Sequence, residues 1–122
     1  MIERLWRAIG WLGVAITLAV SLTPPLLDEG RAHTDKLVHL AGYAALMFWW
    51  AQVVAHKRWR LAAAIGLFGI AIELLQGLTP NRHPDPADVL ANGTGVLLGW
   101  LAARWLPNLP ERIAFLLPAF RR

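Results

Sequence analysis

Apolar residues fill four long segments of this chain, and prolines and polar residues separate them. The segments run over residues 5–22, 36–55, 61–78 and 88–106. Each is close to the roughly 20 residues that a helix needs to cross a bilayer. Stretches such as IGWLGVAITLAV are apolar around the whole helical circumference, which is typical of a helix in lipid rather than of a soluble bundle. The pattern predicts an all-α, polytopic membrane four-helix bundle in a single domain, residues 1–122.

The two ends of the chain leave alternatives open. Arg4 and Arg7, the first apolar segment and the Ala-Val-Ser sequence at 19–21 also fit a cleaved signal peptide. The apolar stretch is long for the hydrophobic region of such a peptide, so we favour an uncleaved first span. The tail at 107–122 contains PERIAFLLPAFRR, which fits either a short C-terminal interfacial helix or a frayed end.

Composition supports a membrane protein. The 122 residues are 57% hydrophobic and only 16% charged, and they include seven tryptophans. Soluble domains average roughly 45–50% apolar residues. The net charge is +4, but the basic residues are scattered beside apolar segments, which suits anionic lipid headgroups rather than nucleic acid. The absence of cysteine excludes disulfides and thiolate metal sites.

Lysine and arginine predict the orientation, because they are enriched in the cytoplasmic loops of membrane proteins. Nine of the twelve lie near the start of the first segment, between the second and third, or from the end of the fourth onward. The other side has three, namely Arg31, Lys36 and Arg82. We therefore expect both termini in the cytoplasm and the loop before the fourth segment outside.

Polar residues gather where three of the segments reach this outer side, around the stretch LTPNRHPDPADVLANGTG. They are Asp35, Lys36 and His39 of the second segment, Glu73 and Gln76 of the third, Arg82 and Asp85 of the loop, and Asp88 and Asn92 of the fourth. Residues three or four apart share a helix face. Glycines follow on the same faces, namely Gly42, Gly66, Gly69, Gly95 and Gly99. Small residues let helices approach closely in lipid, so we expect these three helices to converge on one outward-opening polar pocket, with the first helix as a packing element.

Glu73 is the most informative of these residues. It lies about a turn and a half inside its segment, where an ionised carboxylate costs about 2–3 kcal/mol unless it is paired. Either it locks the helices by pairing with Arg82, the preferred partner, or with His39, or it acts as a base or a ligand contact. His39 either forms a hydrogen bond between helices or relays protons.

The residues that open the second and fourth segments have two interpretations each. We favour Asp35 as the N-cap of its helix, and Asp88 as a member of the pocket rather than a cap. Lys36 lies at the boundary, where it either reaches lipid headgroups or contacts the ligand.

These motifs resemble the VanZ-like family of small bacterial membrane proteins. The resemblance is carried by Asp35-Lys36-Leu-Val-His39, by Glu73-Leu-Leu-Gln76, and by Arg82 followed by Asp88-Val-Leu-Ala-Asn92-Gly-Thr-Gly95. It covers residues 35–99 and implies a multi-pass protein of the bacterial plasma (inner) membrane. The namesake is linked to low-level resistance to teicoplanin, a lipid-bearing glycopeptide that acts on the cell wall. The resemblance therefore supplies a setting in the cell envelope and not a reaction.

Three functions fit the predicted pocket. The favoured one is binding of membrane lipids, a lipid-linked envelope molecule or a lipoglycopeptide, without chemistry. In the alternative, an enzyme acts on a lipid headgroup, with Glu73 or Asp88 as base, His39 as proton relay, and Arg82 with Lys36 holding a phosphate or carboxylate. A small transporter is disfavoured, because four helices leave little room for alternating access unless the chain forms a homo-oligomer.

The sequence leaves the cofactor unknown. A divalent cation bridging Asp85, Asp88 and Glu73 is not favoured, because their spacing is not a recognised metal signature.

Overall fold

The computed structural model describes residues 1–23, 32–80 and 83–117, leaving aside the side chains of residues 32–34. Within these residues the secondary structure consists of five α-helices and no strand. They are α1 (Ile2–Leu22), α2 (Ala32–Ala51), α3 (Arg58–Gln76), α4 (Pro86–Trp105) and α5 (Leu109–Leu116). The predicted all-α fold with four long helices is confirmed, and so is the helix in the C-terminal tail.

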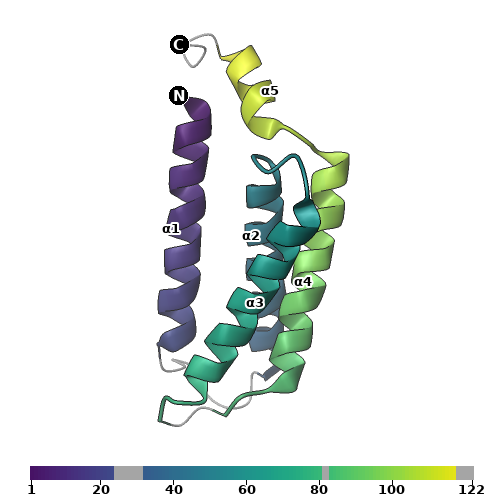
Figure 1. Cartoon of the computed structure of the whole chain (residues 1–122). Coiled ribbons are helices and arrows are strands. Elements are labelled where there is room, and N and C mark those ends of the chain that lie inside the picture. Colours follow the sequence, from purple (N-terminus) through teal and green to yellow (C-terminus); the bar gives the residue numbers. More distant parts are fainter. Residues whose placement is uncertain (24–31, 81–82, 118–122) are drawn as a thin grey trace.

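Successive long helices run in opposite directions (Figure 1). The closest pair is α2 and α4; α3 packs against both, and α1 lies along the outside. The start of α1 and the short α5 lie at one end of the bundle. At the opposite end, α2 begins, α3 ends and α4 begins. We call this second end, with Asp35, Lys36, His39, Glu73, Asp85, Asp88 and Asn92, the polar end.

Two glycines explain why α2 and α4 are so close. A Cβ atom at Gly95 would collide with the backbone carbonyl oxygen of Leu40, and one at Gly99 with that of Ala44. Only a residue without a side chain lets the two backbones touch in this way. The predicted contact along the glycine face of α4 is confirmed.

Of the other predicted glycine contacts, one is confirmed and two are wrong. At Gly69 a Cβ atom would lie 3.0 Å from the Tyr43 ring and 3.3 Å from Nδ2 of Asn92, so this glycine does sit at the meeting point of three helices. The prediction is wrong for Gly42 and Gly66, because nothing lies within 4 Å of a Cβ at either position. Periodicity identified a shared face, but not which member of that face meets a neighbour.

The core lies among α2, α3 and α4, and the buried residues of α1 pack at the end opposite the polar end. The core residues are Tyr43, Leu46, Met47, Ala51, Ile65, Val96 and Ala103. On α1 only Trp6 and Gly10 are buried, which agrees with its predicted role as a packing element. The Trp6 ring stacks on Trp49 with centroids 3.8 Å apart. We call this region, with Trp6, Trp49 and Gln52, the tryptophan end.

The long helices begin two to four residues before the predicted apolar segments, and α2 ends at Ala51 rather than at 55. The first turn of a helix has backbone N–H groups without partners in the helix, so it accepts polar residues that an apolar count leaves out. The end of α2 is fixed by Arg58, which donates to the carbonyl oxygens of Ala51 at 2.7 Å and Val54 at 3.0 Å. A cation at a helix C-terminus satisfies such carbonyls.

Among the described helices, α1 and α3 are long and apolar enough to cross a membrane. The helices α2 and α4 have comparable lengths of 20 residues each. Their first turns contain Asp35, Lys36 and Asp88, which lower their mean hydropathy. The pattern predicted four membrane-spanning helices. The structure has four helices that are long enough to span a membrane, and two of them, α1 and α3, are also apolar enough.

Candidate functional site

An ion-pair cluster joins the starts of α2 and α4 at the polar end. The Lys36 ammonium donates to Oδ2 of Asp85 at 2.7 Å and to Oδ1 of Asp88 at 3.0 Å. The hydrogen bond from Lys36 and the backbone amide of Ala87 lower the pKa of the Asp85 carboxyl below its usual range. Two carboxylates thus hold the Lys36 ammonium within the site, and its contact with lipid headgroups stays a prediction.

Asp85 is also the N-cap of α4. Its Oδ1 accepts from the backbone amide of Ala87 at 2.8 Å, and Pro86 occupies the first helical position, where its missing N–H costs nothing. Asp88 then lies in the first turn, as expected for a member of the site rather than a cap. Asp35 also lies in a first turn, because α2 begins at Ala32, so its predicted role as an N-cap is wrong.

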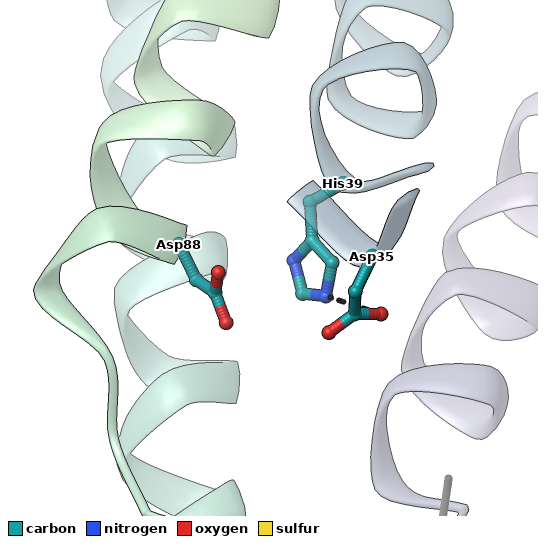
Figure 2. A group of neighbouring side chains, drawn as sticks. All are labelled: Asp35, His39 and Asp88. Carbon is teal, nitrogen blue, oxygen red and sulfur yellow. Dashed lines mark ion pairs between the residues drawn. The ribbon is translucent and has the colours of Figure 1, made fainter. Parts of the chain in front are cut away.

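His39 lies between these carboxylates and the interior. Its Nδ1 is 3.1 Å from Oδ1 of Asn92, and its Nε2 is 3.9 Å from Oδ1 of Asp35. Figure 2 shows the carboxylate groups of Asp35 and Asp88 turned toward the imidazole ring from two different helices. One ring nitrogen and one oxygen of each carboxylate lie within 4.8 Å of one another, a grouping that can hold a metal ion. This set differs from the predicted bridge by Asp85, Asp88 and Glu73.

A layer of buried polar side chains lies directly behind the cluster. Glu73 is 3% exposed, and its Oε2 accepts from the backbone amide of Asp85 at 3.3 Å. Among the described residues its Oε1 has no hydrogen-bond partner, and neither have Nδ2 of Asn92 and the hydroxyl of Tyr43, both residues being 2% exposed. Leaving a buried polar group unsatisfied costs about 1–3 kcal/mol, so three such atoms in one region are a costly arrangement.

The two other predicted members of the site are Gln76 and Arg82. The Gln76 side chain donates to the backbone carbonyl of Ser21 at 2.7 Å and so ties α3 to the end of α1. Arg82, the predicted partner of Glu73, lies outside the described residues. The alternative partner, His39, makes its contacts with Asn92 and Asp35 instead.

Tyr43 is a further buried polar residue that sequence reasoning does not single out, because an aromatic residue in an apolar segment is more often a packing or lipid-facing residue. Its position carried a signal: it lies four residues after His39, which places both on one face of α2. The hydroxyl group on that face is what distinguishes it from a packing phenylalanine.

A protein-family model described as VanZ/LLP1 matches residues 3–107. The chain belongs to the VanZ/LLP1 family. The match to the VanZ/LLP1 model runs from the start of α1 to just past α4 and includes the whole polar end. Searches of curated proteins and of solved structures found no match. The resemblance that the polar motifs predicted is thus confirmed at the level of the family.

Proposed function

We propose that this VanZ/LLP1 chain is a multi-pass membrane protein whose polar end binds the headgroup of an amphiphilic envelope molecule at the outer leaflet. One observation carries the proposal. Polar groups from three helices, far apart in sequence, gather at one end of an otherwise apolar bundle, with unpartnered polar atoms buried behind them. A headgroup at that level would meet polar groups while its tail lay along the helices.

The outer surface of the bundle supports the membrane setting. Large apolar side chains are exposed on all four long helices, among them Trp11, Leu37, Leu67, Leu74, Leu90 and Trp105. Soluble monomers rarely expose apolar patches larger than a few hundred Å². Lipid would cover this surface, and on that basis we extend the span assignment from α1 and α3 to α2 and α4.

The orientation rests on the charge distribution. The start of α1 and α5 lie at the end opposite the polar end (Figure 1), which is the side where nine of the twelve basic residues are expected. With that side in the cytoplasm, the polar end faces the outer leaflet. Phe115 and Leu116 of α5 are largely exposed next to Arg112, as an interfacial helix requires.

The buried layer defines the chemistry of the ligand. Nδ2 of Asn92 is a donor, Oε1 of Glu73 is an acceptor when ionised, and the Tyr43 hydroxyl can do both. A headgroup with hydroxyl, amide or phosphate oxygens and at least one N–H or O–H group would satisfy all three.

Binding is tested with the purified chain in lipid nanodiscs, using two probes, a labelled bacterial lipid extract and teicoplanin. We expect one of them to bind, and Glu73→Gln to weaken that binding at least tenfold. Glu111→Gln is the matched control, since Glu111 is exposed on α5, away from the polar end. Equal binding by both variants would contradict a binding site at the polar end.

An enzyme is the second candidate, and the position of His39 favours it. A ring held through Nδ1 by Asn92 and facing two carboxylates is the arrangement of an oriented base. The same labelled extract, followed over time by chromatography, separates the two candidates. New products with wild type and none with His39→Gln would establish turnover, whereas unchanged lipid would leave binding alone.

A further inference from the structure

We propose that Asp35, His39 and Asp88 form a binding site for a divalent transition-metal ion of the Zn²⁺ type, open on one side. The metal would give the acidic polar end the positive charge to hold an anionic headgroup. The site itself stands on the geometry below, and only its use in holding a headgroup rests on the proposed function.

The first argument is the ligand set. One imidazole nitrogen and two carboxylate oxygens suit Zn²⁺ better than Mg²⁺ or Ca²⁺, which prefer oxygen ligands alone. Three protein ligands leave the fourth tetrahedral position for an oxygen of a bound molecule. The ligand atoms lie within 4.8 Å of one another. With metal–ligand bonds of about 2.1 Å they need to be roughly 3.4 Å apart, so the most distant pair must close by up to about 1.4 Å. Asp35, with a side chain that is 63% exposed, is free to make that movement.

The second argument is the orientation of His39. A metal-binding histidine usually donates its other ring N–H to an oxygen, which fixes the tautomer and turns the free nitrogen to the metal. Nδ1 of His39 lies 3.1 Å from Oδ1 of the buried Asn92. In the tautomer that donates to this oxygen, Nε2 has its lone pair free as a ligand. Without a cation, that lone pair would face the Asp35 carboxylate, whose Oδ1 lies 3.9 Å from Nε2 and repels it.

The third argument concerns charge. The described part of the polar end has four carboxylates, those of Asp35, Glu73, Asp85 and Asp88, and Lys36 as its ammonium group. Glu73 is 3% exposed, its Oε1 is unpartnered, and it interacts electrostatically with both Asp88 and His39. A buried carboxylate that interacts with this group is costly unless a cation lies near it. Among the described residues Lys36 pairs with Asp85 and Asp88 and not with Glu73, and a dication beside His39 and Asp88 would add positive charge near this carboxylate.

The test uses the full chain, purified through a tag without histidines, stripped with EDTA and titrated with ZnCl₂ by calorimetry. We expect one Zn²⁺ per chain. His39→Gln and Asp88→Asn should each weaken the affinity at least tenfold, and Asn92→Leu should weaken it by a smaller factor. The matched controls His56→Gln and Glu111→Gln change exposed residues of the same types at the other end of the bundle and should bind as wild type does. Affinity that is unchanged in His39→Gln would overturn the site.

A second measurement needs no variant and so does not depend on their folding. Wild-type chain loaded with Cu²⁺ should show, by pulsed electron paramagnetic resonance, coupling to the nitrogens of one imidazole; a spectrum without them rejects the site. The nanodisc probes separate this inference from the proposed function. Headgroup binding that persists in EDTA with no Zn²⁺ uptake contradicts only the metal, whereas Zn²⁺ uptake without binding of either probe contradicts only the proposed function.

Discussion

The two ends of the bundle treat buried polar groups in opposite ways. At the tryptophan end, each indole donates to the backbone carbonyl of the other, Trp6 to Trp49 at 2.9 Å and Trp49 to Trp6 at 2.8 Å. The buried Gln52 donates to Phe48 and accepts from the amide of Leu109. At the polar end, Glu73 uses one carboxylate oxygen and leaves the other unpartnered.

This difference separates a region built for stability from one built for a ligand. A fully satisfied polar network makes a unique and stable contact, and it leaves no free hydrogen-bonding group for a ligand. Unsatisfied buried groups cost stability, and proteins retain such costs mainly at functional sites. Substitution of these polar groups should therefore lower the stability of the fold at the tryptophan end and raise it at the polar end.

The largest effect on stability is expected at the contact between α2 and α4. Gly95→Leu or Gly99→Leu would push a side chain into the backbone of α2, so we expect losses above about 4 kcal/mol, or no folded protein. Leu97→Ala and Leu101→Ala remove side chains that are about half exposed, and each should cost below about 1 kcal/mol. Thermal unfolding in detergent makes the comparison, and equal shifts in Tm would mean that the helices do not meet at the glycines.

At the tryptophan end we expect a loss of stability without a loss of function. Trp6→Ala removes a stacked ring and one hydrogen bond, and leaves Trp49 without its stacking partner. The expected cost is about 3 kcal/mol. The free energy of unfolding is measured beside the binding of the nanodisc probes. Weakened probe binding by Trp6→Ala, in samples shown to be folded, would contradict the separation of the two ends.

At the polar end we expect the reverse. Tyr43→Phe removes a buried hydroxyl that has no partner and keeps the ring, so the chain should become more stable by about 1 kcal/mol. Glu73→Gln removes a buried charge and should shift stability in the same direction, while it weakens probe binding. Both are measured in EDTA, so that metal binding does not contribute. A fall in Tm for both would show that these groups support the fold.

The sequence alone predicted the helices and the gathering of polar residues, because both follow from periodicity. Apolar segments marked the helices, and the spacing of His39, Asp88 and Asn92 placed them at one level. What periodicity could not show is which neighbour each residue meets. The start of α2 at Ala32 turned Asp35 from a cap into a first-turn residue.

The same limit applies to the ends of the other helices. Gln76 shares the face of Glu73 on α3, yet it donates to the end of α1, because α1 lies beside α3 at that point. The capping residue of α4 could be predicted only from the Asp-Pro pair at 85 and 86, an N-cap followed by a proline suited to the first helical position. Pairing between helices depends on their distances, which a single sequence does not contain.

The smallest effect concerns the ion pairs of Lys36, and its sign follows from the pKa of Asp85. Lys36 holds this pKa below the usual value for aspartate, which is about 4. A group with a lowered pKa in the folded state stabilises the fold above its unfolded pKa, and the contribution disappears as the pH falls through the folded pKa. Half-exposed ion pairs are screened by solvent, so the contribution is modest.

We therefore expect Lys36→Gln to lower Tm by a constant small amount between pH 7 and pH 5, in EDTA, and to converge with wild type as the pH falls below about 4. Arg7→Gln breaks the exposed pair with Glu3 at the other end and is the matched control, with a smaller shift at every pH, because that pair joins residues of one helix. The pairs of Lys36 join α2 to α4, so losing them releases one helix from another. A Tm difference that persists unchanged to pH 3 would mean that the Lys36 side chain contributes by packing, and that its charge does not hold the polar end together.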